Sequence, residues 1–438
     1  MKILIGKKET YSYLKKIRSN DLSKIKSSGN GYFSKEYTLD TYVKKVNEMT
    51  HKEGDDFLVN LSSKIDGKAF GKIEVPKTEI NNSLSKITEK EKNAIQSTID
   101  RVKVFQEKTL NKSWFDESKG YGEYIKPVES IGCYIPSGSA PLLSTIIMTV
   151  IPAKIAGVER IVVCSPTIGN EMPNKYLLAT SKLCGVDEFY TYGGSQAISA
   201  MAYGTETIPK VDLICGPGNI FVMAAKKSVY GDVGVDGIFG PTETLIICDK
   251  SANKEFVVSD LMAQAEHDVL ALPMLITDDQ DFANEINNLY LKKLNNLSRR
   301  EIISKSMERG FISILNGEDE MIEACNIIAA EHTTIASEKL IDISKKITSS
   351  GSLFLGEISS EVLADYVAGP SHVMPTNGSA RYSSSLSTRT FTKSIPVLSI
   401  DKTQFEKICS DGEILANLES LDAHGNALSI RKQFFIGD

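Results

Sequence analysis

Only five histidines are available for proton chemistry in this 438-residue chain, and four of them lie near a second group that can bind a proton or a metal. The nearest such pair is Glu331 and His332, which are adjacent. Neighbouring side chains on a helix or strand point in different directions, so the two could serve separate proton transfers rather than form one dyad. A Glu-His dipeptide alone is common and needs support from other residues.

A second set of side chains has the chemistry of metal ligands. Gln264 and His267 lie three residues apart in SDLMAQAEHD and would share a face if this segment is helical. With Asp365 and His424 they make an oxygen and nitrogen ligand set without sulfur, which zinc accepts and which is more typical of catalytic than of structural sites. Spacing does not show that the four meet, and Gln264 and His267 would also fit the polar end of a surface helix.

Glycine-rich turns follow two strand-like runs, at Gly193-Gly194 and at residues 216–218. In open α/β sheets ligands bind beyond the carboxyl ends of strands, so a nucleotide or a substrate is expected at these turns. The segment GCYIPSGSAP (132–141) is also loop-like and offers Tyr134 as an exposed aromatic candidate. GPGNIF lacks the third glycine of the dinucleotide fingerprint, and such turns can be purely structural.

Short β-rich runs recur from about residue 131, and helix-length segments separate them. Such alternation implies βαβ crossovers and a mostly parallel sheet. A turn at Gly240-Pro241 divides the runs into two groups, which predicts two α/β domains. The runs cover residues 160–166, 188–194, 211–219, 242–249, 273–279, 310–315 and 351–356.

We therefore divide the chain into four parts. The first is a helical N-terminal part that contributes to the large domain, the next two are Rossmann-like α/β domains, and the last is a helical C-terminal tail. Their expected bounds are 1–130, 131–240, 241–385 and 386–438.

Two local patterns predict individual helices. Thr88 followed by Glu91 has the form of a capping box, and an apolar stripe then runs to Leu110. The apolar stretch from Leu142 to Val158 contains Pro152, so it is expected to be a buried helix that ends or kinks there.

Composition excludes several classes of protein. Fifty basic against 56 acidic residues give a net charge of −6, whereas nucleic-acid binders usually carry a basic surplus. No stretch approaches the roughly 20 apolar residues of a membrane span, and the start has no secretory apolar region. The seven cysteines contain no CxxC pair, so they are expected to be core residues in a reducing cytoplasm.

Seven segments, in order, resemble the histidinol dehydrogenase family. They span about residues 132–424, some two-thirds of the chain, and their spacing also fits the family. Each segment alone is weak, but together they are highly specific. The segments are GCYIPSGSAPLLSTIIMTVIPAKIAGV, GGSQAISAMAYGTETIPKVDLICGPGN, FGPTE, DLMAQAEHD, AAEH, DYVAGPSHVMPT and LESLDAH.

The resemblance implies a fold, an activity and two cofactors. The family has two Rossmann-like, aldehyde-dehydrogenase-like parallel-sheet domains with small helical N- and C-terminal parts. Its members oxidise L-histidinol to L-histidine through L-histidinaldehyde, in two NAD-dependent steps that end histidine biosynthesis. We therefore expect a cytoplasmic homodimer with NAD and one Zn²⁺ per subunit, and with no nucleic-acid or membrane partner.

The resemblance also assigns roles to residues. The family's C-terminal tail crosses to the other subunit, so Glu419 and His424 are expected to complete the partner's site. The zinc ligands and His332 are also expected to touch the substrate. The implied NAD contacts are Tyr134, Gln196 and Asn219, the implied zinc ligands are Gln264, His267, Asp365 and His424, the acid/base pair is Glu331 and His332, and Thr242 and Glu419 are further substrate contacts.

The chain departs from the family pattern at a few positions. Thr242 stands where serine is usual and keeps the hydroxyl. Ala330 replaces a proline, and Ser137 and Ser420 each replace a glycine. LSTRTF (386–391) departs from LSVxDF. None of these changes removes a catalytic group.

A mechanism follows from these parts. A neutral imidazole is suited to removing the alcohol proton near pH 7, and we assign this role to His332 in both oxidations. Glu331 is expected to activate the water that adds to the aldehyde, and Glu419 to pair with a cationic or N–H group of the substrate. Zinc would mainly orient the substrate.

Three alternatives remain at this point. A dehydrogenase of the same family could act on another amino alcohol or on a sulfonated diol; the acidic Glu419 argues against an anionic substrate. A zinc hydrolase could use Glu331 without NAD, which would leave Tyr134, Gln196 and Asn219 without a role. A non-catalytic α/β binding protein would make every one of these matches accidental.

Overall fold

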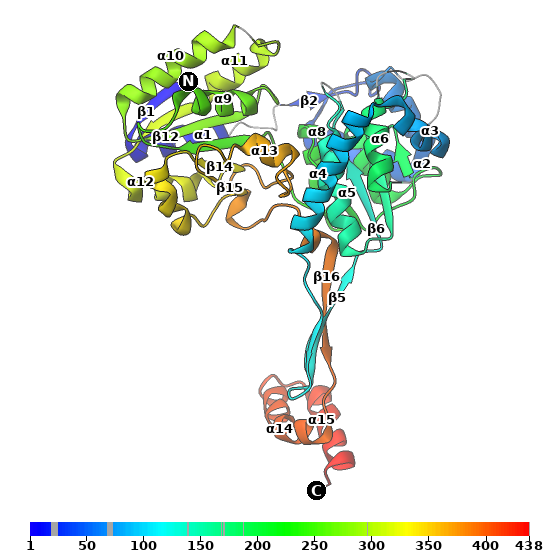
Figure 1. The fold of residues 1–438 in the computed structure, drawn as a ribbon. Coiled ribbons are helices and arrows are strands. Elements are labelled where there is room, and N and C mark those ends of the chain that lie inside the picture. Colours follow the sequence, from blue (N-terminus) through cyan, green and yellow to red (C-terminus); the bar gives the residue numbers. More distant parts are fainter. Residues whose placement is uncertain are drawn as a thin grey trace. The chain divides into compact units, whose positions relative to one another are not determined.

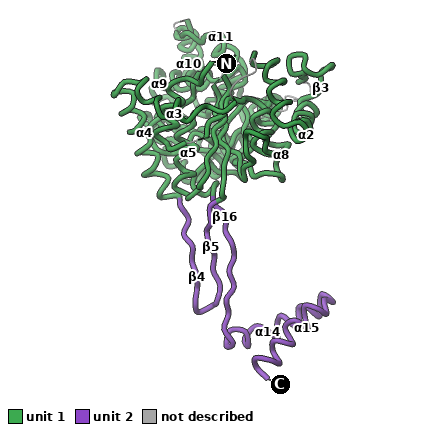
Figure 2. Tube along the Cα trace, turned by 90° about the vertical axis from the view of Figure 1, so that its right-hand side faces the viewer, with its two compact units in different colours: residues 1–109, 128–391 green, residues 110–127, 392–438 purple. Residues whose placement is uncertain are grey.

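The chain forms two compact units, which Figure 2 colours separately. The first unit comprises Met1–Thr109 and Val128–Phe391, and the second comprises Leu110–Pro127 and Thr392–Asp438. The computed structural model describes residues 1–18, 25–67, 73–137, 140–167, 169, 171–186, 188–295 and 297–437.

A five-stranded parallel sheet organises one half of the first unit (Figure 1). Its strand order is β10-β9-β6-β7-β8, so the chain moves outward on one side of β6 and then returns to the other side. The strands are β6 (Ser130–Tyr134), β7 (Arg160–Cys164), β8 (Glu188–Tyr190), β9 (Leu213–Cys215) and β10 (Gly234–Val235).

Helices cover both faces of this sheet, and the N-terminal region supplies one long helix to each. One core joins α4 to α5 and α6, and the other joins α2 to α7 and α8. The bounds of these helices are α2 (Leu39–Ile65), α4 (Glu89–Glu107), α5 (Leu143–Ala156), α6 (Lys175–Cys184), α7 (Gly194–Tyr203) and α8 (Ile220–Val229). The N-terminal region also contains the shorter helix α3 (Lys77–Asn82) and an antiparallel pair of strands, β2 (Lys26–Ser27) and β3 (Tyr37–Thr38).

A six-stranded parallel sheet organises the other half, with the order β1-β13-β12-β11-β14-β15. One face packs against α1 and α12, and the other packs against α9, α10 and α11. The strands are β1 (Lys2–Ile5), β11 (Glu243–Ile247), β12 (Leu272–Thr277), β13 (Phe311–Ile314), β14 (His332–Ile335) and β15 (Ser352–Leu355). The helices are α1 (Gly6–Arg18), α9 (Lys254–Ala265), α10 (Gln280–Leu294), α11 (Arg300–Arg309), α12 (Gly317–Ile328) and α13 (Glu361–Tyr366).

Two parallel sheets with covering helices confirm the predicted α/β class, and every strand-like run named from the sequence contains a strand. In these two sheets, four strands were not predicted: β1, β6, β10 and β14. β1 lies in the N-terminal part that was expected to be helical, and it pairs with β13 some 310 residues later. The segment containing Tyr134 was expected to be a loop, yet β6 is the central strand of its sheet.

The sequence predicted a helix that either ends or kinks at Pro152. The helix α5 does not end there. It continues to Ala156 and stops at Gly157, which adopts a left-handed conformation. Proline cannot donate a hydrogen bond to the carbonyl four residues earlier, which belongs to Met148. The hydroxyl of Ser371 donates to that oxygen instead, at 3.3 Å, so the group left open by Pro152 is satisfied.

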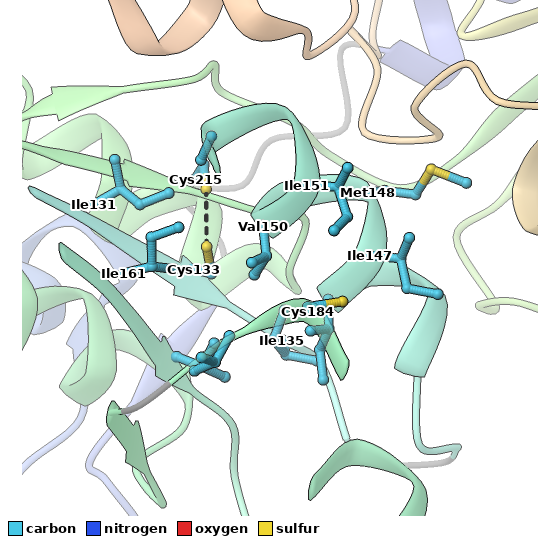
Figure 3. Close-up of a cluster of buried hydrophobic side chains, with 14 of the residues drawn as sticks. Ile131, Cys133, Ile135, Ile147, Met148, Val150, Ile151, Ile161, Cys184 and Cys215 are labelled. Carbon is cyan, nitrogen blue, oxygen red and sulfur yellow. Dashed lines mark hydrogen bonds between the residues drawn. The ribbon is translucent and has the colours of Figure 1, made fainter. Parts of the chain in front are cut away.

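The core around α5 also holds three of the seven cysteines (Figure 3). Cys133 on β6 and Cys215 on β9 are direct partners in the sheet, and their sulfurs lie 3.6 Å apart. All seven cysteines are buried, which confirms their prediction as core residues. The capping box of Thr88 and Glu91 at the start of α4 is also confirmed.

The second unit contains an antiparallel sheet and a pair of helices (Figure 1). Its sheet has the order β16-β5-β4, and α14 packs against α15. Of the expected tail at 386–438, residues 386–391 belong to the first unit, and the part in the second unit begins with a strand at Thr392. Residues 110–127 also belong to the second unit. The bounds are β4 (Trp114–Asp116), β5 (Tyr121–Pro127), β16 (Thr392–Leu398), α14 (Lys402–Leu418) and α15 (Asp422–Phe435). In the described part of the chain, no helix has both the length and the apolar character needed to span a membrane.

Candidate active site

The acid/base candidates meet at the amino end of β14. Glu331 precedes this strand and His332 is its first residue, and both are buried. Their side chains are not separated, as adjacency had suggested, because His332 Nδ1 lies 3.7 Å from Glu331 Oε2. Both side chains turn toward the neighbouring strand β11, which brings them together.

The Glu331 carboxylate is held by two donors from the start of β11. The Thr242 hydroxyl donates to Oε2 at 2.5 Å, and the backbone N–H of Glu243 donates to the same oxygen at 3.1 Å. Burial nevertheless raises the pKa of Glu331 to about 7, because these donors and His332 offset only part of the desolvation. Near neutral pH this carboxyl can therefore either hold or accept a proton.

His332 is surrounded by acceptors. Its Nδ1 donates to the Glu243 carbonyl oxygen at 3.3 Å, and its Nε2 lies 3.6 Å from Asp365 Oδ1, outside hydrogen-bond distance. Burial alone would lower the pKa of His332, but Glu331, Asp365 and Glu361 raise it to about 10. These carboxyl groups favour the charged form of the ring, whereas the role expected for His332 needs the neutral form.

Three of the four expected zinc ligands lie in the six-stranded half of the first unit. Gln264 is in the last turn of α9, and its side-chain oxygen lies 3.0 Å from the Thr242 hydroxyl. His267 was expected to share a helix with Gln264 if this segment is helical. The helix α9 ends at Ala265, however, so His267 lies just beyond it. Asp365 lies in α13, against His332.

The donor chemistry of this set fits zinc. Burial lowers the pKa of His267, which keeps its imidazole neutral, and burial raises the pKa of Asp365 less than nearby histidines lower it, which keeps the carboxylate ionised. These are the states in which both groups bind metals. Among the described residues no three His, Cys, Asp or Glu side chains are arranged to hold a metal. His267 and Asp365 are two side chains of these types, whereas the other two expected ligands are the Gln264 amide and His424 of the second unit.

The three expected NAD contacts line a single cavity in the five-stranded half. Its volume is about 360 Å³, within the usual range for small-molecule sites. Tyr134 is 3% exposed rather than exposed as expected, and its hydroxyl accepts from the Gly194 N–H at 3.2 Å. The Asn219 side-chain oxygen caps α8 by accepting from two N–H groups, and Gln196 is buried in α7.

Backbone approach shapes the same cavity. Gly216 has a φ of 109°, and a Cβ atom there would lie 2.2 Å from the Tyr134 carbonyl oxygen. A side chain at Gly193 would likewise meet Pro166 at 2.4 Å. The glycine turns therefore bring strand ends close together, which is what a site for an extended cofactor requires.

The two halves present their residues at opposite strand ends. The cavity lies beyond the carboxyl ends of β6, β7, β8 and β9, at the point where the strand order reverses, as expected for an open α/β sheet. Thr242 and Glu331, in contrast, directly precede β11 and β14. These two residues therefore lie at the amino ends of their strands, opposite to the end at which open α/β sheets usually bind ligands.

Comparisons with known proteins agree with the sequence segments. The family model for histidinol dehydrogenase matches residues 33–432. The curated histidinol dehydrogenase of Listeria monocytogenes serotype 4b (strain F2365) is 41% identical over 90% of this chain and 93% of its own length. The crystal structure of histidinol dehydrogenase from Elizabethkingia anophelis has a TM-score of 0.90 and 34% identity, and covers 99% of this chain and 98% of its own.

This chain belongs to the histidinol dehydrogenase family. The resemblance found in the sequence is thereby confirmed, as is the expectation of an oxidoreductase. A second curated member, from Aquifex aeolicus, is 39% identical over 89% of this chain and 92% of its own length.

Glu419 and His424, also expected from the family, lie in the second unit. Glu419 is the residue that follows α14, and His424 lies in the first turn of α15, with both side chains exposed. They do not share a helix. Ser420 between them has a φ of 57°, in the left-handed region that glycine favours.

The sequence did not identify Glu361 and Glu243 as parts of this site. Glu361 is fully buried in α13, and its carboxylate accepts from the Thr244 hydroxyl at 2.6 Å. Burial raises its pKa to about 8. Its position four residues before Asp365 places it on the same helix face, a spacing that could have revealed it.

Proposed function

We propose that this chain is a zinc- and NAD-dependent histidinol dehydrogenase. It oxidises L-histidinol to L-histidine through L-histidinaldehyde, a four-electron reaction at the end of histidine biosynthesis. The observation that carries the proposal is the joining of Glu331 and His332 by the start of β11, with Gln264 and Asp365 beside them. Seven buried thiols support a reducing, cytoplasmic location.

His332 serves the alcohol oxidation as the proton acceptor. When bound, NAD supplies the hydride acceptor and zinc supplies a Lewis acid that holds the substrate's nitrogen donors. The imidazole must be neutral to act, whereas Glu331 and Asp365 favour its charged form and raise its pKa. Use of Asp365 as a metal ligand withdraws part of that negative charge, which favours proton loss from the ring.

Glu331 serves the aldehyde oxidation. Its carboxylate is poised near neutral pH and can take a proton from a water molecule that adds to the aldehyde carbon. The Thr242 hydroxyl and the Glu243 N–H hold the carboxylate in place while it does so. His332 then accepts the hydroxyl proton of the hydrated aldehyde as the second hydride leaves.

Tyr134, Gln196 and Asn219 bind NAD in the cavity of the five-stranded half. Burial raises the pKa of Tyr134 to about 12, so its hydroxyl keeps its proton. The Asn219 oxygen is occupied as a helix cap, which leaves its NH₂ group to donate to the cofactor.

A homodimer completes the site in this proposal. Glu419 and His424 of one subunit contribute to the site of its partner, Glu419 by pairing with the substrate's N–H side and His424 as the fourth zinc ligand. The helices α14 and α15 leave large apolar side chains exposed, including Leu418 at 76% and Phe434 at 81%, and surfaces of this kind are typical of interfaces.

The test is the amount of NADH formed from L-histidinol and NAD, with zinc content measured in parallel. Two NADH per histidinol consumed are expected, with loss of activity on chelation and recovery on adding Zn²⁺. One NADH per substrate would contradict the four-electron reaction. No NADH from the folded, zinc-loaded protein would direct the search to other amino alcohols and to sulfonated diols.

A further inference from the structure

Glu243 connects the two acid/base residues through its backbone. Its N–H donates to Glu331 Oε2 at 3.1 Å, and its carbonyl oxygen accepts from His332 Nδ1 at 3.3 Å. One peptide segment of β11 therefore orients both side chains. Any rotation of this segment would displace Glu331 and His332 together.

The side chain of Glu243 is itself fixed by Arg18, at the last position of α1. The guanidinium donates to both carboxylate oxygens, from Nε and Nη2 to Oε1 at 3.2 and 2.9 Å and from Nη2 to Oε2 at 2.9 Å. The pair is largely buried, with side chains 15% and 5% exposed. The Asn377 N–H also donates to Oε2, at 3.0 Å.

We propose that Arg18 and Glu243 are positioning residues for Glu331 and His332. The pair ties the N-terminal helix α1 to the start of β11, and the β11 backbone then sets the orientation of the acid and the base. The inference rests on the proposed function and goes beyond it, because it gives the N-terminal region a part in the reaction. Neither residue touches the substrate in this proposal.

Charge adds to the argument from geometry. The Glu243 carboxylate is buried close to Glu331, and like charges at this range oppose each other's ionisation. Arg18 neutralises the Glu243 carboxylate. The Glu243 backbone can therefore hold Glu331 and His332 without placing a second uncompensated negative charge beside Glu331.

Three variants separate positioning from folding. Arg18→Met and Glu243→Gln each leave one buried partner alone, which is expected to lower stability. The double variant Arg18→Met/Glu243→Gln removes both charges, and replacing both members of a buried pair is often neutral for stability. Arg160→Met is the matched control, because Arg160 forms a similar bidentate ion pair with Glu188 in the five-stranded sheet.

The measurements are the thermal midpoint, zinc content, KM for histidinol and kcat for each oxidation. We expect the double variant to regain most of the stability lost in the single variants and to keep zinc and KM. Its kcat should remain about 10- to 100-fold low in both oxidations, as expected for displaced catalytic groups. Arg160→Met should lower the thermal midpoint and leave kcat unchanged.

Recovery of kcat together with stability in the double variant would overturn the inference, since the pair would then matter only for folding. A raised KM with unchanged kcat would overturn it as well. An unreactive parent protein would overturn the proposed function, and the inference with it, whereas an active parent with fully active Arg18 variants would overturn the inference alone.

Discussion

Glu331 and His332 are neighbours in sequence with opposite electrostatic surroundings. Two donors reach the Glu331 carboxylate, and burial still raises its pKa to about 7. Carboxylates surround His332 and raise its pKa, against the effect of burial. Such a division of surroundings is how one site obtains an acid and a base with different proton affinities.

The Glu331→Gln variant tests this division. The amide cannot accept a proton, so oxidation of histidinaldehyde should fall by about 10²–10⁴-fold, and oxidation of histidinol much less. In the parent protein the aldehyde step should accelerate as pH rises through about 7, because the pKa of Glu331 is raised to that value and the base acts only when deprotonated.

The pH dependence near 7 should be absent in Glu331→Gln. Single-turnover rates for each half-reaction, measured from pH 6 to 9, give the comparison. An equal loss in both half-reactions would reassign the water-activating role away from Glu331.

Gln196, Asn219 and Thr242 were named only through the family resemblance. Residue types alone nominated the acid/base pair and the expected zinc ligands, because histidine exchanges protons near pH 7 and both histidine and carboxylate groups bind zinc. They could not reveal Glu243, whose contribution is a backbone N–H and a carbonyl. That contribution depends on the pairing of Thr244 with His332 across β11 and β14, a register set by tertiary structure. The burial of Tyr134 was also not predicted, because the glycines and serines that flank it indicate a loop.

At the scale of elements, the turn between α14 and α15 carries a local conflict. Ser420 adopts a left-handed conformation, with φ at 57°, where a side chain is disfavoured by about 1–2 kcal/mol. The turn therefore has a backbone conformation that glycine adopts most readily, whereas this chain supplies serine.

Ser420→Gly should stabilise the second unit by about 1 kcal/mol, because relief of backbone strain outweighs the greater freedom of glycine in the unfolded chain. The free energy of unfolding, followed by helix loss in denaturant, gives the measurement. Lys407→Gly, at an exposed position inside α14, is the matched control and should destabilise by up to about 1 kcal/mol. A destabilised Ser420→Gly variant would show that the conformation of this turn carries no strain.

Strand prediction succeeded where apolar residues form runs, as in β7 (RIVVC) and β12 (LPMLIT). It failed for β14, whose sequence HTTI is short and polar, and for β1, whose run of four residues is also short. Both strands are stabilised by parallel partners that lie far away in sequence. No local window contains those partners, so only the assembled sheet defines these elements.

At the scale of the whole molecule, the expected site residues are distributed over both units. The first unit holds the acid/base pair and three candidate zinc ligands, and the second holds Glu419 and His424. If the second unit serves a partner subunit, a subunit with a defective first unit and a subunit with a defective second unit should together form an active site.

Coexpression of Glu331→Gln and His424→Asn subunits tests this sharing. In a randomly assorted population, about a quarter of the sites would combine an intact first unit with an intact second unit from the partner. Histidine formation should therefore recover to about a quarter of the parent rate, although each variant alone is nearly inactive. A mixture no more active than its components would mean that each tail serves its own subunit.

The distribution of the buried thiols has a consequence for following how this molecule comes apart. Cys133, Cys164, Cys184 and Cys215 lie in the five-stranded half, Cys248 and Cys325 in the six-stranded half, and Cys409 in the second unit. An alkylating reagent reaches such thiols only when the surrounding structure opens. The order in which the seven sulfurs become labelled during slow denaturation would thus record the order in which the two sheets and the helical hairpin open, with no engineered probe.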